Sequence, residues 1–308
     1  MNMTEPTHFL NTTLRGELRT DVAMSKHTSW RAGGCVDRLY KPVDLADLQN
    51  FVRGLSATEP LIAVGLGSNL LVRDGGLRGT VVLTYGALNE MRLENAVTVY
   101  VQAGVAGAKL ARFTAANHLA GGEFFAGIPG TVGGMLTMNA GCYGGETWRL
   151  VERVQVLTHS GDLIERTPAD YVVGYRNARL KSPVAGDEIF VGAWLKFHPS
   201  NGDSTQAEIK ALLEKRQASQ PLNLPNAGSV FRNPADHFAA QLIESCGLKK
   251  LQMGGAQVSE KHANFIVNID AATAADIENL MIEVQSIVLE KTGIELHPEV
   301  RIIGEYAK

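Results

Sequence analysis

The most informative part of this sequence is Gly121-Gly-Glu-Phe-Phe-Ala-Gly-Ile-Pro-Gly-Thr-Val-Gly-Gly-Met-Leu-Thr-Met-Asn-Ala-Gly-Cys-Tyr-Gly-Gly145, in which nine of 25 residues are glycine. Gly127-Ile-Pro-Gly130 predicts a tight turn, because proline fixes φ and glycine is free to adopt positive φ. Gly133 and Gly134 leave the backbone bare where another group approaches closely. Bare amides in such a turn point N–H donors outward and bind anions, above all phosphates. The alternative is a glycine-rich turn with a purely structural role.

Size and charge indicate an ordinary globular protein. A chain of 308 residues suits two or three domains. Its net charge of −3 provides no basic field for binding nucleic acid or an anionic membrane.

Cysteine usage and the N-terminus indicate the compartment. The three cysteines are far apart, odd in number and without a C-x-x-C pair, so we expect neither a disulfide framework nor a cysteine zinc site. The histidines show no metal-ligand spacing, so we expect no metal. The N-terminus lacks the basic and apolar regions of a signal peptide, and no apolar run reaches the roughly 18 residues of a membrane span. We therefore expect a cytoplasmic protein.

A second glycine loop lies upstream. The apolar run Leu61–Val64 predicts a buried strand that leads directly into Gly65-Leu-Gly-Ser-Asn-Leu70. A Rossmann fingerprint would need a third glycine at position 70, and the residues after the loop are typical of a strand and turn, so we reject that fold. What remains is a loop of backbone amides at residues 65–69.

The rest of the chain predicts strands in the first two hundred residues and a compact α+β unit after a polar break at residues 199–203. Ser160-Gly-Asp162 predicts a hairpin turn. Residues 174–180 are polar and predict an irregular segment. A helix is expected at 45–55 with Asp44 as its N-cap, and a long amphipathic helix at 272–291 that ends at Gly293. Two glycine loops on one scaffold suit a dinucleotide cofactor bound outside a Rossmann fold, and FAD suits them best.

Motifs along the whole chain then point to one family. They are His27-Thr-Ser-Trp-Arg-Ala-Gly-Gly, Gly65-Leu-Gly-Ser-Asn-Leu-Leu, Gly127-Ile-Pro-Gly-Thr-Val-Gly-Gly, Met138-Asn-Ala-Gly-Cys-Tyr-Gly, Tyr175-Arg-Asn, Gln220-Pro-Leu with Ala227-Gly-Ser-Val-Phe-Arg-Asn-Pro, Gly254-Gly-Ala-Gln-Val-Ser-Glu-Lys-His-Ala-Asn-Phe-Ile-Val-Asn and Pro298-Glu-Val-Arg301. In this order the set resembles the UDP-N-acetylenolpyruvoylglucosamine reductases, flavoenzymes of peptidoglycan precursor synthesis. One departure is Asn264, where many relatives have glycine.

The resemblance implies an α+β fold, in which a two-subdomain FAD-binding fold of the vanillyl-alcohol-oxidase (PCMH) type precedes a substrate domain. We expect the subdomains at residues 1–84 and 85–200, the substrate domain at 201–298, and a return of residues 299–308 to the first subdomain. The chain resembles the shorter class of the family, which lacks a tyrosine-bearing loop. Because residues 65–76 contain no His or Cys, we expect non-covalent FAD.

The resemblance also assigns residues. NADPH is the implied co-substrate, and the implied reaction reduces UDP-N-acetylglucosamine-enolpyruvate to UDP-N-acetylmuramate. Arg176 would hold the substrate carboxylate, Glu299 would hydrogen-bond the carboxylate or enolate, and Ser229 would protonate the carbanion. Tyr175, Arg216, Arg232 and Asn233 are candidates for substrate contacts. The expected FAD-binding residues are Gly65, Leu66, Gly67, Ser68, Asn69, Leu70, Gly127, Ile128, Pro129, Gly130, Thr131, Gly133, Gly134, Asn139, Ala140 and Gly141.

Each catalytic residue has a plain alternative when it is taken outside its motif. Arg176 is then a surface ion-pair residue, Glu299 a solvated strand residue and Ser229 a turn hydroxyl. Two other functions also stay open: an FAD-dependent oxidase or dehydrogenase of another small molecule, and a flavin-binding regulator without catalysis. We expect a monomer that binds a small-molecule substrate and neither nucleic acid nor a membrane.

Overall fold

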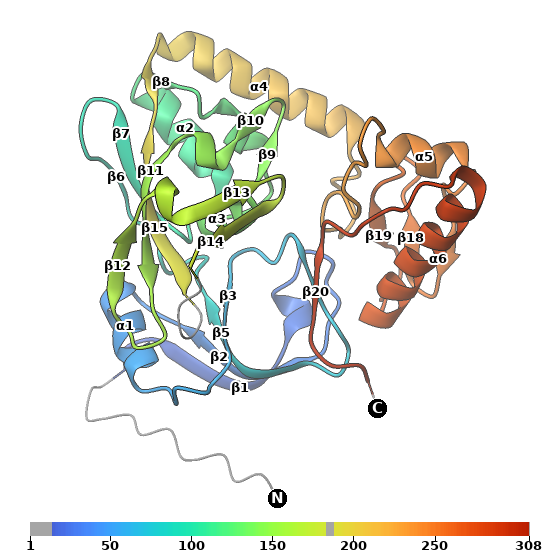
Figure 1. Ribbon diagram of the computed structural model, residues 1–308, viewed down its shortest axis with the longest axis horizontal. Helices are drawn as coiled ribbons and strands as arrows, with labels where there is room; N and C mark the ends of the chain where they lie inside the picture. Colours follow the sequence, from blue (N-terminus) through green and yellow to red (C-terminus); the bar gives the residue numbers. More distant parts are fainter. Residues whose placement is uncertain (1–13, 183–187, 308) are drawn as a thin grey trace, which may run out of the picture. The chain divides into compact units, whose positions relative to one another are not determined.

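The computed structural model describes residues 14–182 and 188–307 (Figure 1). The chain divides into two compact units. Unit 1 comprises Met1–Thr20, Arg38–Gly65 and Gly79–Leu213, and unit 2 comprises Asp21–Asp37, Leu66–Arg78 and Glu214–Lys308. The chain passes between the units inside strands β1 (Glu17–Ala23), β2 (Cys35–Lys41) and β5 (Leu77–Leu83), after β3 (Leu61–Val64), and inside helix α4 (Gly202–Ser219). The three-domain division expected from the sequence stays a prediction, and its first 13 residues lie outside the described part.

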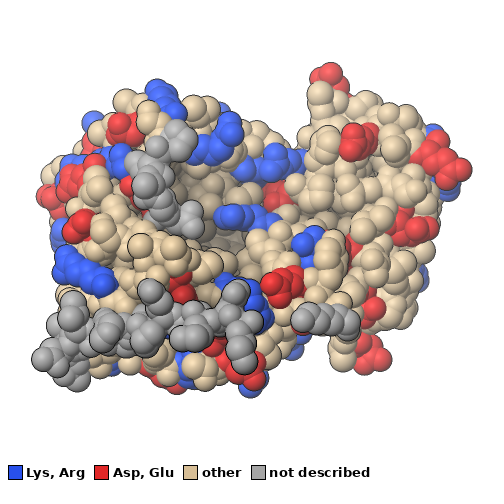
Figure 2. Space-filling model, turned by 60° about the horizontal axis from the view of Figure 1, so that its bottom comes forward, with Lys and Arg blue, Asp and Glu red and all other residues tan. Residues whose placement is uncertain are grey.

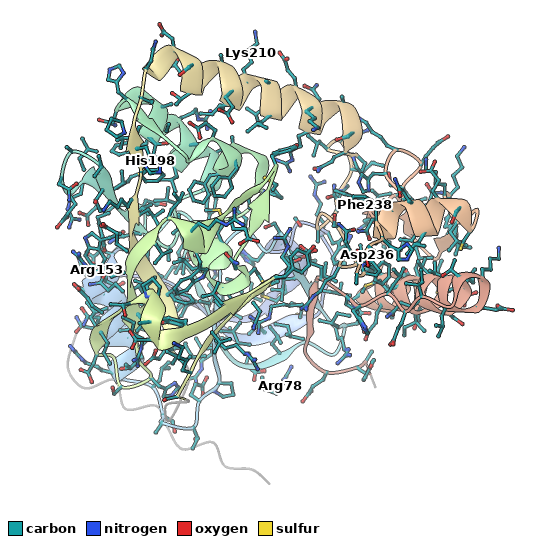
Figure 3. The ribbon with its side chains drawn as sticks, turned by 45° about the horizontal axis from the view of Figure 1, so that its top comes forward. Arg78, Arg153, His198, Lys210, Asp236 and Phe238 are labelled. Atoms are coloured by element: carbon teal, nitrogen blue, oxygen red, sulfur yellow. The ribbon has the colours of Figure 1, made fainter. Side chains whose placement is uncertain are left out.

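Unit 1 is built on a five-stranded antiparallel sheet. Its order is β12 (Leu163–Arg166), β11 (Val151–Leu157), β15 (Ile189–Lys196), β7 (Thr98–Gln102) and β6 (Met91–Leu93), with β11, β15 and β7 at its centre (Figure 1). Gly161 adopts φ 81° between β11 and β12, so the expected hairpin turn is confirmed. Arg153, which is labelled in Figure 3, belongs to β11. Its Cζ lies 4.0 Å from the ring centre of Trp194.

Two helices and a β-hairpin of unit 1 lie next to or carry residues of the candidate site. α2 (Gly107–Ala116) and α3 (Val132–Met138) contribute Leu110, Val132, Met135 and Leu136 to the same buried cluster as β7 and β15. Strands β13 (Tyr171–Gly174) and β14 (Asn177–Leu180) form a hairpin. The expectation of an irregular segment at 174–180 is therefore wrong. No residue of β14 is buried, so this strand lacks the alternation of buried and exposed residues that would have revealed it.

A second buried cluster in unit 1 joins helix α1 (Leu45–Arg53) to β3 and β5. Asp44 caps α1 by accepting a hydrogen bond from the Asp47 N–H at 2.8 Å, as expected. β3 and β5 pair in parallel within a four-stranded sheet of order β1-β2-β5-β3. The remaining short elements of unit 1 are β8 (Leu119–Ala120), β9 (Gly141–Cys142), β10 (Gly145–Glu146), β16 (His198–Pro199) and the 3₁₀ turns at 123–127, 147–149 and 168–170.

Unit 2 packs helices α5 (Ala239–Ser245) and α6 (Ala274–Thr292) with a three-stranded sheet of β17 (Gln252–Met253), β18 (Ala256–Val258) and β19 (Ile266–Asn268) (Figure 1). α6 begins at a capping box of Thr273 and Asp276 and ends at Gly293, which adopts φ 70°. Its predicted apolar face is confirmed, since Ile277, Leu280, Met281, Val284 and Val288 are buried in the core and Ile287 packs against it. β4 (Leu70–Val72) pairs in parallel with β20 (Arg301–Ile303), and a 3₁₀ turn at 24–26 completes the unit.

Candidate active site

The glycine-rich stretch of unit 1 contains a helix that the sequence analysis did not predict. Two glycines in its first turn disfavour a helix. Tertiary hydrogen bonds overcome this cost: Val132 N–H donates to Val105 O and Gly133 N–H to Ala103 O, both at 2.9 Å. Gly107 N–H also donates to Gly130 O at 3.0 Å. The stretch is therefore fixed against residues 103–107, and α3 starts directly after Thr131.

Most glycines of this stretch are required by the protein's own packing. A Cβ on Gly127 would lie 2.8 Å from Cys142 Sγ, and one on Gly133 would lie 3.0 Å from Ala103 Cβ. The sequence analysis expected a close neighbour at both positions 133 and 134. At Gly133 that neighbour is Ala103, whereas a Cβ on Gly134 would meet its first atom, Thr131 Oγ1, only at 4.0 Å. Gly134 thus keeps an open side.

Thr131 and Gly65 form the part of unit 1 that suits a phosphate. Thr131 is 2% exposed, and its Oγ1 has no hydrogen-bond partner among the described residues. Although Thr131 precedes α3, its hydroxyl does not cap the helix. A Cβ on Gly65 would lie 2.2 Å from this oxygen, so only glycine allows the approach. A buried hydroxyl without a partner is costly, and an FAD phosphate oxygen would supply the missing bond. The residues present therefore fit the cofactor.

Arg176 lies at the tip of the β13–β14 hairpin. Tyr175 and Arg176 are the two residues between the paired Gly174 and Asn177, and Arg176 adopts φ 54°. Its guanidinium donates to Gly141 O at 3.0 Å and lies 4.9 Å from the ring centre of Tyr175. Burial raises the pKa of Tyr171, at the start of this hairpin, above its usual range.

Asn139 connects the glycine-rich stretch to this hairpin. It ends α3 with φ 40°, and its side chain accepts from Trp148 N–H at 3.1 Å and donates to Gly174 O at 3.1 Å. The Asn139 side chain thus supports the hairpin that carries Arg176. Sequence reasoning assigned it only to FAD; an asparagine at a left-handed helix end was the available signal.

From Leu66 onward the upstream glycine loop belongs to unit 2, and residues 27–29 fix this part of it. Gly67 adopts φ 59°, and a Cβ there would lie 2.1 Å from His27 O. Gly67 O accepts from Ser29 N–H at 3.1 Å, and Ser29 Oγ donates to Asn226 O at 2.6 Å. The Gly67 position is closed to any other residue by both conformation and space.

Ser229 and Glu299 lie on neighbouring segments of unit 2. Glu299 N–H donates to Val230 O at 2.7 Å, so the residue after Ser229 is bonded to Glu299 itself. Asn69, at the end of the glycine loop, donates from Nδ2 to Glu299 O at 3.2 Å, and its own carbonyl accepts from Arg301 N–H at 3.0 Å. The loop, the serine and the glutamate therefore belong to one hydrogen-bonded arrangement. Arg176, the third predicted catalytic residue, belongs to unit 1.

Two of the four candidate substrate residues, Asn233 and Arg216, bond through their side chains within the protein. Asn233 Oδ1 accepts from Ala239 N–H at 3.1 Å at the start of α5, and Arg216 Nε donates to Gln220 Oε1 at 3.1 Å. Arg232 N–H donates to His297 O at 2.9 Å, whereas its buried Nε has no partner among the described residues. Tyr175 is 49% exposed.

Comparisons with known proteins identify the family. Residues 220–303 match the model of the UDP-N-acetylenolpyruvoylglucosamine reductase C-terminal domain, and residues 36–167 match an FAD binding domain. The UDP-N-acetylenolpyruvoylglucosamine reductase of Thiobacillus denitrificans is 53% identical over 305 residues, covering 95% of this chain and 94% of that protein. The chain belongs to the UDP-N-acetylenolpyruvoylglucosamine reductase family.

Other members of the reductase family agree. The reductase of Legionella pneumophila is 51% identical over 292 residues, covering 94% of each chain. The crystal structure of the reductase from Thermus caldophilus superposes with a TM-score of 0.79 at 31% identity, covering 94% of this chain and 99% of that one. The resemblance, the α+β fold class and FAD as the cofactor are thus confirmed.

The structure also bears on metal sites, membrane spans and disulfides. No cluster of three or more His, Cys, Asp or Glu able to hold a metal ion occurs in residues 14–182 and 188–307. Within the same residues, no helix has the length and apolar content needed to cross a membrane. None of Cys35, Cys142 and Cys246 forms a disulfide in the part of the chain that the structure describes.

Proposed function

We propose that this chain reduces UDP-N-acetylglucosamine-enolpyruvate to UDP-N-acetylmuramate with bound FAD and with NADPH as the reductant, a step in peptidoglycan precursor synthesis. The observation that carries the proposal is the match, over 95% of the chain and at 53% identity, to a UDP-N-acetylenolpyruvoylglucosamine reductase. The buried, unpartnered Thr131 hydroxyl beside Gly65 supports non-covalent FAD binding.

FAD held at Thr131 and Gly65 would supply the redox chemistry, which is the transfer of a hydride from NADPH to the vinyl carbon of the substrate. The chain's own residues manage the charge that then develops. Arg176 binds the substrate carboxylate, since a planar guanidinium of fixed charge suits a bidentate contact. Its bond to Gly141 O holds the guanidinium in a defined direction.

Glu299 and Ser229 act together in this proposal. Glu299 hydrogen-bonds the carboxylate or the enolate, and Ser229 protonates the carbanion carbon from its hydroxyl. A serine hydroxyl is a weak acid, so its position relative to the reacting carbon must compensate. The bond from Glu299 N–H to Val230 O supports this pairing, because it fixes the backbone spacing of the two residues.

We also propose the three-domain division stated above and a monomeric enzyme in the cytoplasm, in keeping with three cysteines that form no disulfide among the described residues. On the face drawn in Figure 2, acidic and basic side chains both occur, in keeping with the net charge of −3. Four residues remain candidates for substrate contacts: Tyr175, Arg216, Arg232 and Asn233.

The test separates the two half-reactions. We expect Ser229→Ala to leave flavin reduction by NADPH nearly intact and to slow anaerobic reoxidation by the enolpyruvyl substrate by roughly 10²- to 10⁴-fold. We expect Glu299→Gln to slow reoxidation more than it weakens FAD binding. Ser245→Ala is the matched control, because that exposed hydroxyl of unit 2 bonds only Leu242 O within α5 among the hydrogen bonds described.

The outcomes distinguish the alternatives. Equal losses in both half-reactions would contradict the proton-donor role of Ser229, and loss of flavin from Glu299→Gln would make Glu299 structural. An oxidase of another small molecule would not be reoxidised by the enolpyruvyl substrate in the absence of oxygen. A regulator without catalysis would show no steady NADPH oxidation.

A further inference from the structure

The segment that carries Ser229 is hydrogen-bonded along one edge to the segment that carries Glu299. Val230 O accepts from Glu299 N–H at 2.7 Å, and Arg232 N–H donates to His297 O at 2.9 Å. Phe231 and Pro298 form an antiparallel bridge between these bonds. This edge sets the register between Ser229 and Glu299, because a shift of one residue would break both bonds.

The opposite edge of the same segment is held by Asn264. The backbone carbonyl of Asn264 accepts from Val230 N–H at 2.9 Å. The side chain of Asn264 bonds both backbone polar groups of Phe231, the residue after Val230: Oδ1 accepts from Phe231 N–H at 3.0 Å and Nδ2 donates to Phe231 O at 2.8 Å. The carboxamide of Asn264 thus replaces a peptide group of a neighbouring strand.

This contact is closed to solvent. Asn264 is 4% exposed and Phe231 is 2% exposed, so water has little access to replace the side chain if it is removed. Before Ser229 the chain is held through Asn226, which forms an antiparallel bridge with Val267 and accepts at its carbonyl from Ser29 Oγ. Gly228 adopts φ 75°, a Cβ there would meet no atom within 4 Å, and the Gly228 N–H donates to Asn226 Oδ1 at 3.0 Å. The side-chain bonds of Asn264 to Phe231 thus fix the backbone two residues after Ser229.

We propose that Asn264 is a positioning residue for the reaction: it fixes the backbone after Ser229 so that the serine hydroxyl keeps its place relative to Glu299. The inference rests on the proposed roles of Ser229 and Glu299. Proton transfer from a weak acid depends steeply on geometry, and a displacement of about 1 Å can cost about 100-fold in rate. Asn264 does not need to touch the substrate to affect this step.

The test compares Asn264→Ala with the wild-type holoenzyme in the two half-reactions. We expect flavin reduction by NADPH to change less than about twofold and reoxidation by UDP-N-acetylglucosamine-enolpyruvate to slow by roughly 10- to 100-fold. The solvent deuterium isotope effect on reoxidation should rise, because proton transfer becomes more strongly limiting. Asn264→Gly is a second variant in case the alanine protein folds poorly, and it should give the same pattern.

Asn268→Ala is the matched control. Asn268 is 8% exposed and also makes two buried side-chain bonds to backbone, to Trp30 O and from Ala272 N–H, both at 2.9 Å. Neither bond involves residues 228–232 or 297–299. We expect this variant to lose stability while the ratio of the two half-reaction rates and the isotope effect stay at the wild-type values.

A double variant separates the inference from the function on which it rests. If Asn264 acts through Ser229, adding Asn264→Ala to Ser229→Ala should slow reoxidation little further. If Ser229→Ala slows reoxidation but Asn264→Ala and Asn264→Gly slow both half-reactions equally or neither, the positioning role is overturned alone. If Ser229→Ala leaves reoxidation unchanged, the proposed proton donor fails, and the positioning role falls with it.

Discussion

Replacing Thr131 by valine should change the apoprotein and the holoenzyme in opposite directions. The Thr131 hydroxyl is buried and has no partner among the described residues, and it leaves α3 uncapped, so valine removes no existing bond there. A buried unsatisfied polar group costs about 1–3 kcal/mol. We therefore expect Thr131→Val to raise the free energy of unfolding of the flavin-free protein by about that amount. A hydrogen bond to a charged group contributes about 1.5–3 kcal/mol, so the dissociation constant of FAD should rise roughly tenfold to hundredfold.

The assay is urea denaturation of the flavin-free protein, followed by tryptophan fluorescence, together with titration of FAD by its own fluorescence. Thr114→Val is the control, since Thr114 is 1% exposed but its hydroxyl donates to Ala111 O at 3.0 Å. That variant should lose about 0.5–1.5 kcal/mol of stability and bind FAD normally. If the flavin-free Thr131→Val protein is less stable than the wild type, the Thr131 hydroxyl has a hydrogen-bond partner without FAD, and its assignment to a phosphate of FAD is refuted.

Three further outcomes follow from other contacts. Asp74 accepts from the N–H groups of Ala274 and Ala275 at the start of α6, at 3.0 and 2.8 Å, so Asp74→Ala should lower the free energy of unfolding by about 1 kcal/mol in urea denaturation. Gly67→Ala should reduce the flavin content of the purified protein, since its Cβ would overlap His27 O; unchanged absorbance at 450 nm would contradict this. Burial lowers the pKa of His262 below 6.5 in the folded protein. The contribution of the neutral His262 ring to the free energy of unfolding should therefore be complete above pH 6.5 and be lost as pH falls through the folded-state pKa. Unfolding of wild type and His262→Gln between pH 7.5 and 5 should show a steeper loss in the wild type.

The elements that the sequence predicted well are those whose signals are local. α6 has a capping box, an apolar face at helical spacing and a terminal glycine within one stretch of chain. The β11–β12 turn likewise needed only Gly161 between two alternating strands. α3 was missed because its stability comes from residues 103–105, which lie about 30 positions earlier and replace what two glycines lose in propensity.

The candidate site divides in the same way. Ser229, Glu299 and Arg176 were assigned from motifs, and their roles stay predictions. From the sequence, Asn264 was noted only as a departure from the family, and no role was assigned to it. Its side chain bonds to Phe231, 33 residues away. No local sequence pattern indicates that a side-chain carboxamide will make the hydrogen bonds that a peptide group of a neighbouring strand usually makes. The signal available was a buried-type segment with one polar residue at its centre, which demands a partner.

The hydrogen bonds of unit 2 connect the upstream glycine loop to Glu299 and to the segment that carries Ser229. Asn69 bonds through its side chain to Glu299 O and through its carbonyl to Arg301 N–H, while Glu299 N–H holds Val230 O. Any shift of the loop on binding a phosphate would therefore be passed to the Glu299 backbone on one side and then to the Ser229 segment. Asn264 resists such a shift from the other side of that segment. In the proposed function, the binding of FAD by this loop and the placement of Ser229 as proton donor thus depend on the same few backbone bonds. We predict that a substitution that loosens these bonds slows reoxidation of the flavin before it destabilises the fold.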